Sequence, residues 1–201
     1  MPYYTRVLSP ASMPVSPALL EDAARAHGAV VTGDLDQSEW EQLVVTNSEG
    51  REVCALERNA VSPGSLAEEE LVEFQAEVAT CRPASAVGWL QEYLKSVRTI
   101  YAFQVLSGTE GKNGWEALGA VKDAVLSAVG GILQADLEGF SNEEGYHILW
   151  QFADHVTGHW WMAVLKDGQW ERFRMDLGSQ AHRAAFMAGE VPEGAERPGG
   201  V

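Results

Sequence analysis

The stretch YYTRVLS (residues 3–9) recurs with few changes as YAFQVLS (residues 101–107). Both copies alternate along the chain with the period of two that is typical of a β-strand. A helix pattern follows each copy, over residues 17–27 in the first half and over residues 115–129 in the second. Glycines close both helix patterns, as is common at helix ends. The two stretches therefore predict two halves that each begin with a strand and a helix.

The similarity between the halves continues beyond the two helices. GAVVTGDLD (residues 28–36) aligns with GGILQADLE (residues 130–138). The segment 40–59, which contains TNSEGREVCALERN, aligns with the segment 146–167 when two residues are added to the second hairpin loop. We therefore predict an internal duplication in which each half has the element order β-α-β-β-β.

One more strand and three helices complete the pattern. QWERFRMDL (residues 169–177) follows Asp167-Gly168, a dipeptide that favours a tight hairpin. Helix patterns cover residues 66–78, 84–97 and 180–188. Hairpins and helices of this kind predict an α+β fold with two related halves, mainly antiparallel sheet and two linking helices.

These elements predict how the chain is organised into domains. The predicted parts are a first repeat over residues 1–60, a helical linker over 61–98, a second repeat over 99–190 and a flexible tail over 191–201. The tail is rich in glycine, proline and charge, a composition that favours fraying. We expect the parts to form one compact, two-lobed unit.

The order of elements resembles that of the vicinal oxygen chelate fold, which is built from paired β-α-β-β-β units; tandem ferredoxin-like units are a second layout. The vicinal oxygen chelate family takes metal ligands from the first and last strands of its modules. The matching positions in this chain are Arg6, Gln104, Glu57 and Leu165. These residues do not form a metal ligand set, so the resemblance concerns the fold and does not extend to the activity.

Composition narrows the classes of function. The chain has 201 residues, of which 46% are apolar, and its formal net charge is −15. A nucleic-acid partner is not expected, because binding phosphates requires a basic face. We expect a cytoplasmic protein, because no apolar run reaches the ~20 residues of a membrane span, and because the start of the chain lacks a secretory signal pattern. Cys54 and Cys81 are predicted to be reduced.

His155 and His159 are candidate metal ligands. Histidines four residues apart share one face of a helix and can then bind zinc together. Here Thr157 and Gly158 lie between them, and the alignment places both histidines beside a hairpin loop. Asp154 and the acidic pair at 143–144 could add oxygen ligands. We favour two polar loop histidines over a metal site, and we expect no cofactor.

Two acidic pairs recur at matching positions in the two halves. Asp34 and Asp36 align with Asp136 and Glu138, and each pair is predicted to share one face at the end of a strand. Neighbouring carboxylates can raise one another's pKa and serve as an acid or base, or they can hold a cation. Because a structural device would also recur in both halves, we favour a role in binding backbone amides of the following turn.

Tryptophans concentrate in the second half of the chain. Trp150, Trp160 and Trp161 all lie in the segment that is predicted to form its hairpin. The strand that starts at Trp160 has two apolar faces, which predicts a central strand that is covered on both sides. The cover could be helices, the other half, a ligand or another protein. A larger core is the simplest interpretation, and a working surface in the second half is the alternative.

No residue pattern in the chain predicts a nucleophilic catalytic site. We therefore predict a non-enzymatic binding or protein-interaction protein, of the kind found among bacterial immunity-like or adaptor-like modules, with possible self-association through the second-half sheet. The alternative is a small-molecule-binding or metal-dependent enzyme with a cup between its paired modules. The candidate ligand-binding residues are Asp136, Glu138, His147, Trp150, His159 and Trp161.

Overall fold

The computed structural model describes residues 2–33, 35, 39–153 and 155–199. The strands are β1 (Tyr3–Ser9), β2 (Val30–Gly33), β3 (Gln42–Thr46), β4 (Glu52–Ala60), β5 (Thr99–Val105), β6 (Ile132–Ala135), β7 (Gly139–Ser141), β8 (His159–Lys166) and β9 (Gln169–Asp176). The helices are α1 (Pro17–Arg25), α2 (Leu66–Val78), α3 (Ala84–Ser96), α4 (Gly114–Val129) and α5 (Gln180–Met187), with a 3-10 helix η1 (Ser107–Glu110). These elements and the antiparallel pairing of the strands confirm the α+β class.

The chain divides into two compact units, and unit 1 takes segments from both predicted repeats, whereas unit 2 combines most of the helical linker with the rest of the second repeat. Unit 1 comprises residues 1–69 and 97–136, and unit 2 comprises residues 70–96 and 137–201. The duplication therefore stays a prediction about the sequence, because the compact units do not follow its halves. Helix α2 spans the boundary between them.

Unit 1 contains a sheet with the strand order β2-β3-β4-β5-β1-β6. Strand β1 pairs antiparallel with both β5 and β6, so the connection from β5 through α4 to β6 steps over β1. This is the split β-α-β arrangement of ferredoxin-like folds, extended by β2 and β3 at one edge. It differs from the vicinal oxygen chelate layout, in which β1 would stay with the strands of its own half.

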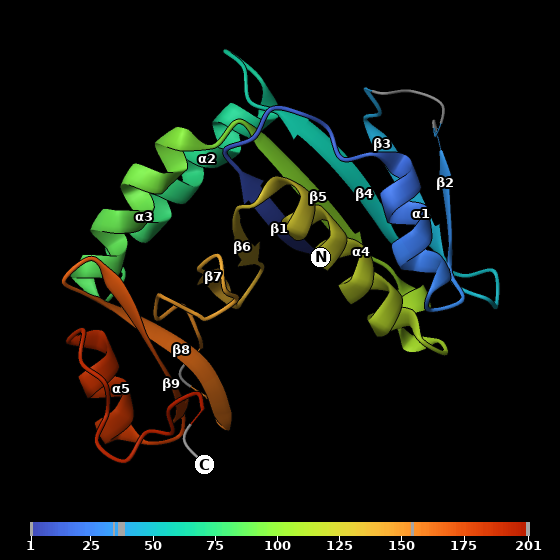
Figure 1. Ribbon diagram of the computed structural model, residues 1–201. Coiled ribbons are helices and arrows are strands. Elements are labelled where there is room, and N and C mark those ends of the chain that lie inside the picture. The colour runs from blue at the N-terminus through green and yellow to red at the C-terminus, as the bar shows by residue number, and fades with distance from the viewer. Residues whose placement is uncertain (1, 34, 36–38, 154, 200–201) are drawn as a thin grey trace. The chain divides into compact units, whose positions relative to one another are not determined.

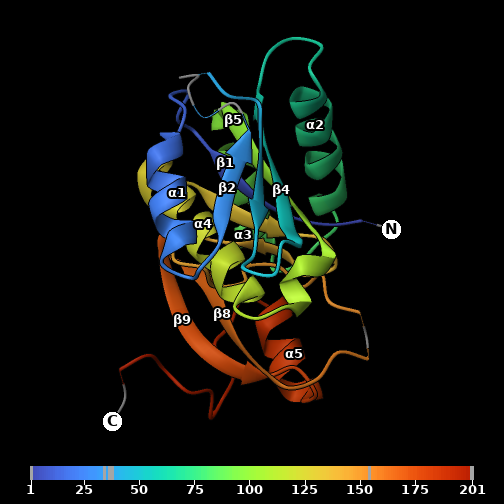
Figure 2. The same ribbon diagram turned by 90° about the vertical axis from the view of Figure 1, so that its right-hand side faces the viewer.

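Helices α1 and α4 lie together on one face of this sheet (Figures 1 and 2). Alternation along the strands sends every second side chain toward the helices. The largest buried side chains of this core include Trp40, Leu43, Leu56, Tyr101 and Phe103. The indole N–H of Trp40 donates to the carbonyl of Val15 at 2.7 Å, which satisfies the polar atom of this buried ring.

Unit 2 is built on the hairpin of β8 and β9, with α5 beside it (Figure 1). Asp167 and Gly168 both have positive φ, 49° and 78°, as the predicted tight turn requires. One face of the hairpin is buried in a second core, formed with α5 by Phe152, Met162, Val164, Phe173, Met175, Leu177 and Phe186. The hydroxyl of Ser179 caps α5 by accepting a hydrogen bond from the N–H of His182.

The segment 146–153 does not form the regular strand that the alignment predicts. It meets β8 at one residue, where His147 pairs with Met162 in parallel direction, and it meets β7 where His147 pairs with Ser141. The antiparallel hairpin expected between this segment and β8 is therefore wrong. The reason is that the chain pairs with β8 only at His147, and there in the parallel direction.

Two five-residue loops, one in each unit, have the same pattern of hydrogen bonds. The Asn47 loop (Asn47–Arg51) connects β3 and β4, and the Asn142 loop (Asn142–Tyr146) follows β7. In each, the asparagine Oδ1 accepts from the amides two and four residues later. In each, the fourth residue is a glycine with positive φ, 76° at Gly50 and 84° at Gly145. The loop that matches NSEGR is thus NEEGY, and not the 154–159 region that the alignment selects.

Candidate functional site

The exposed face of the β8–β9 hairpin carries Trp161. Cross-strand register pairs Trp161 with Arg174 and Ala163 with Arg172, and directly opposed residues share a face. Trp161 is 38% exposed, whereas Met162 on the opposite face is fully buried in the core of unit 2. Helix α3 covers the end of this face near the turn, where the rings of Trp89 and Trp170 meet edge to face at 5.0 Å. The open part of the face therefore lies around Trp161.

Aromatic and arginine side chains surround Trp161. The ring of Tyr146 meets Trp161 edge to face at 5.9 Å, and the guanidinium of Arg172 lies over the ring of Tyr146 at 5.8 Å. Both interactions restrict the side chains before any partner binds. We call Tyr146, Trp161, Arg172 and Arg174 the Trp161 patch.

Two glutamates neutralise the arginines of the Trp161 patch. Arg172 Nη1 donates to Glu144 Oε2 at 2.8 Å, and Arg174 Nη1 lies 3.4 Å from Glu196 Oε2. All four charged side chains are more than 40% exposed, so water screens both ion pairs. Such pairs exchange partners readily, and both arginines can take up a carboxylate from another molecule at small cost.

His147, Trp150 and Trp160 gather in an aromatic cluster on the core face of the hairpin. The ring of His147 lies 5.0 Å from Trp160 and 5.3 Å from Phe152, and Trp150 lies 5.5 Å from Phe152. Burial lowers the pKa of His147 from 6.5 to about 4, because the apolar rings disfavour the charged imidazolium. His147 is therefore neutral at physiological pH and packs as part of the core.

The predicted site residues thus separate onto two faces. Trp161 lies on the exposed face of the hairpin, while His147 and Trp150 lie with the core. Met162, Ala163 and Val164 are fully buried in the middle of β8, as expected for a strand covered on both faces, although β8 belongs to a two-stranded sheet and is not a central strand. The protein's own residues cover the middle of this strand on both faces, so the exposed surface is limited to its Trp161 end.

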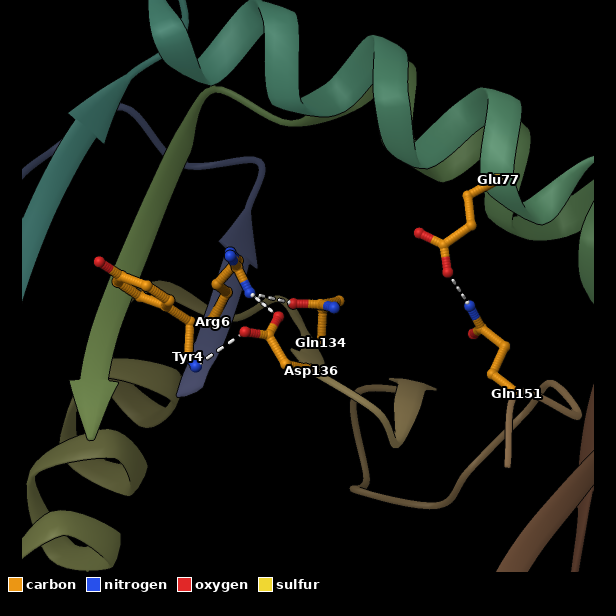
Figure 3. Close-up of polar contacts among 6 residues, drawn as sticks. All are labelled: Tyr4, Arg6, Glu77, Gln134, Asp136 and Gln151. Atoms are coloured by element: carbon orange, nitrogen blue, oxygen red, sulfur yellow. Dashed lines mark hydrogen bonds and ion pairs between the residues drawn. The ribbon is translucent and has the colours of Figure 1, made fainter. Parts of the chain in front are cut away.

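Asp136 belongs to unit 1, where it forms a polar cluster with Arg6 (Figure 3). Arg6 Nη1 donates to Asp136 Oδ1 at 2.8 Å and to Gln134 Oε1 at 2.7 Å. The backbone N–H of Tyr4 donates to Asp136 Oδ2 at 2.9 Å, so each carboxylate oxygen accepts a bond. The guanidinium of Arg6 also lies over the ring of Tyr4 at 5.1 Å. These contacts hold strand β6 to strand β1, a structural role.

Glu138 does not share a strand face with Asp136. Strand β6 ends at Ala135, and residues 136–138 form a turn in which Leu137 has a φ of 67°. A positive φ interrupts the alternation of side chains that the prediction assumed. The matching residues of the first half, Asp34 and Asp36, lie outside the described residues.

His155 and His159 are both exposed on the surface of unit 2. His159 begins β8, opposite Asp176 of β9, while His155 lies in the segment before that strand. Among the residues that the structure describes, no three histidine, cysteine or acidic side chains are grouped so that they could hold a metal ion. Asp154, the predicted additional ligand, lies outside the described residues.

A second polar contact within unit 2 ties the segment 146–153 to α2. The amide nitrogen Nε2 of Gln151 donates to Glu77 Oε1 at 2.9 Å (Figure 3). Gly139 makes room for this side chain, since a Cβ there would lie 2.3 Å from Gln151 Oε1. The backbone N–H of Trp150 donates to the carbonyl of Arg82 in the same unit, at 2.8 Å. These bonds position the neighbouring aromatic cluster.

Sequence reasoning missed Tyr146 and the two arginines of the Trp161 patch. A usable signal was present in QWERFRMD, where Trp170, Arg172 and Arg174 alternate with apolar or acidic residues and thus share one face. Tyr146 could not be found this way, because a loop and not a strand brings it to Trp161.

No protein-family model, curated protein or solved structure matches this chain significantly. Among the described residues, no helix is both long enough and apolar enough to span a membrane.

Proposed function

We propose that this chain is a non-enzymatic binding protein that recognises another protein through the Trp161 patch. The observation that carries the proposal is a partly exposed tryptophan held by Tyr146 and flanked by two arginines. Tryptophan, tyrosine and arginine are the residue types that contribute most of the affinity in protein interfaces. Their side chains are already ordered by one another, which lowers the entropic cost of binding.

The chemistry of the buried titratable groups supports a binding role over catalysis. Burial raises the pKa of the Cys54 thiol to about 12, so this thiol stays protonated and unreactive at pH 7. Burial lowers the pKa of His147 to about 4, so this imidazole does not exchange protons near neutrality. Both shifts keep the group uncharged, which is what packing requires.

A small-molecule-binding or metal-dependent enzyme is the weaker alternative. It draws on Asp136 and Glu138, and the carboxylate of Asp136 is already bonded on both oxygens within unit 1. Glu138 lies in the turn that follows β6 and belongs to unit 2. The contacts of these two acids therefore favour local structural roles.

The test compares two tryptophans in the full-length chain. Trp161→Ala removes the centre of the patch, and Trp115→Ala removes a more exposed tryptophan (57%) from α4 in unit 1. We expect the tagged wild type and Trp115→Ala to retain one stoichiometric partner from a lysate of the source organism. We expect Trp161→Ala, folded by circular dichroism, to retain at least roughly tenfold less, as loss of an interface hot spot implies.

Two outcomes would overturn the proposal. One is that wild-type protein retains no partner at stoichiometric level; the other is that Trp161→Ala retains it as well as Trp115→Ala does. Sedimentation of the purified chain identifies whether the partner is a second copy, because self-association through this face would produce a dimer that Trp161→Ala dissociates.

A further inference from the structure

At its outer edge, beside the Trp161 patch, strand β9 directs the backbone hydrogen-bonding groups of alternate residues away from β8. In an antiparallel pair, residues alternate between bonding to the partner strand and pointing their N–H and C=O groups away from it. The N–H of Arg174 donates to the carbonyl of Glu196, so the backbone of Arg174 points away from β8. By the same alternation, the backbones of Trp170 and Arg172 point outward too. The backbone N–H and C=O groups of Trp170 and Arg172 form no hydrogen bond with the backbone of a described residue on this side of β9.

The chain's own C-terminal segment shows that this edge accepts a strand. Arg174 and Glu196 exchange both backbone hydrogen bonds, at 2.7 and 3.1 Å, as an antiparallel bridge. The carboxylate of Glu196 also lies 3.4 Å from the guanidinium of Arg174. The segment thus combines strand pairing with an acidic side chain opposite an arginine of the Trp161 patch.

Pro198 explains why the pairing stops after one bridge. Continuing the antiparallel register by two residues would place residue 198 opposite Arg172. Proline has no N–H, so Pro198 cannot donate to the carbonyl of Arg172. The edge at Trp170 and Arg172 therefore remains open, although its backbone geometry continues that of the bridged residue.

We infer that this open edge binds an extended segment of the partner protein, which adds to β9 as an antiparallel strand and places a carboxylate opposite Arg172. The inference rests on the proposed function and names the chemistry of its partner. Strand addition of this kind obtains affinity from main-chain hydrogen bonds and specificity from alternate side chains. Because Arg172 shares its face with Trp161, the side chains opposite it would face the Trp161 patch.

The charges at this edge favour a partner segment over a second copy of the chain. Symmetric antiparallel pairing of two β9 edges through Trp170 and Arg172 would be centred on Glu171. It would place Glu171 directly opposite its own copy, and like charges in that position are destabilising. It would also bring together two chains that each carry a net charge of −15. A carboxylate from a different segment meets Arg172 without this repulsion.

The first experiment uses peptides selected from a random-sequence library on the full-length wild-type chain. We expect the selected peptides to share an acidic residue, and Arg172→Glu to weaken their binding at least tenfold. Lys112→Glu, which makes the same charge change at an exposed position of unit 1, should leave their binding within about twofold. Methylating the peptide's backbone nitrogens one at a time should abolish binding at every second position only, because alternate N–H groups face β9.

The second experiment extends the chain's own strand. Pro198→Thr restores an N–H at residue 198 and should let the C-terminal segment pair with Arg172. We expect the amide of Arg172 to exchange with solvent more than tenfold more slowly in Pro198→Thr than in wild type. The same variant should bind the selected peptides at least fivefold more weakly, because its own segment competes. Pro63→Thr, at an exposed turn of unit 1, is the matched control and should change neither quantity.

The two proposals fail in different ways. A library that yields no binder, or binders whose N-methylation pattern does not alternate, overturns strand addition. Trp161→Ala would still lose the partner in that case, and the proposed function would stand. Retention of the partner by Trp161→Ala overturns the proposed function. The selected peptides could then no longer be taken to represent a segment of that partner.

Discussion

The Asn47 loop and the Asn142 loop share one backbone design and differ in what surrounds them. In unit 1, Asn47 is only 5% exposed, and its Nδ2 donates to the carbonyl of Gly108 in η1 at 2.9 Å. In unit 2, Asn142 is fully buried, but its Nδ2 has no hydrogen-bond partner among the described residues. The Asn47 loop is hydrogen-bonded to η1, whereas the Asn142 loop ends in Tyr146, which packs against Trp161.

The comparison shows how one loop design can serve as scaffold in one place and as support for a surface in another. The asparagine side chain accepts the bonds from the loop amides, and the glycine provides the positive φ that the turn requires. The residue after the glycine differs between the two loops, and it is Arg51 in one and Tyr146 in the other. The following variants test which properties the two loops share and in which they differ.

Gly108→Ala should have the largest effect on stability, and only in unit 1. A Cβ at Gly108 would lie 2.3 Å from the carbonyl oxygen of Glu52, so η1 would have to move away from the Asn47 loop. We expect a loss of about 3 kcal/mol in the free energy of unfolding of unit 1, the upper end of the typical cost of overpacking, because the atoms in the way belong to the backbone. Hydrogen exchange read by unit measures this. Gly119→Ala on α4, which meets nothing within 4 Å, should not destabilise the unit.

Replacing each asparagine with aspartate should destabilise unit 1 more than unit 2. Asn47→Asp keeps the acceptor Oδ1 but replaces the donor that binds the Gly108 carbonyl, so two oxygens would face each other in a buried site. We expect a loss of roughly 2–4 kcal/mol in unit 1. Asn142→Asp loses no hydrogen bond of this kind and should cost clearly less in unit 2. Equal losses in the two units would show that the surroundings of the loops do not matter.

Acid should weaken unit 2 through His147, the residue that follows the Asn142 loop. Its pKa is lowered to about 4 in the folded state, so the unfolded chain binds a proton first as pH falls below 6.5. Stability is thus lost on acidification from about pH 6.5 to pH 4, by roughly 2 kcal/mol at pH 5. His147→Gln should flatten this part of the pH dependence in denaturant titrations. A variant with the wild-type slope would exclude His147 as its cause.

Gly50→Ala and Gly145→Ala should have small and equal effects. Both glycines have positive φ, and an added Cβ would meet nothing within 4 Å at either position. The cost is therefore that of the backbone conformation alone, about 1 kcal/mol in each unit. Thermal unfolding of the two variants measures it. A difference well above the experimental error would show that the two loops are not equivalent.

Much of the fold could be predicted from local patterns in the sequence. The strand and helix periodicities placed α2 at its observed bounds and β9 within one residue of them, and Asp167-Gly168 identified the hairpin turn. The position of β1 between β5 and β6 could not be predicted, because non-local strand pairing leaves no trace in the spacing of residues.

The candidate site was harder to predict, for reasons that particular residues make clear. The alignment matched Gly50 with Gly158, whereas the shared Asn-x-Glu-Gly spacing matches it with Gly145. Because of this wrong match, residues 146–153 were predicted to form a strand, and His147 was grouped with Trp161 as a candidate site residue. In the structure His147 pairs with Met162 in a parallel bridge, so its side chain lies on the face of Met162. Trp161, the residue before Met162, lies on the opposite face of β8.

Hydrogen exchange on the complex with the captured partner tests the central claim most directly, because it locates the contact surface without any substitution. We predict slower exchange in the segments around Tyr146, Trp161 and Arg172, and no change in the sheet of unit 1. The amide of Arg172 should show the strongest protection if the partner adds a strand to β9. Protection confined to unit 1, with unchanged exchange around Trp161, would contradict the account.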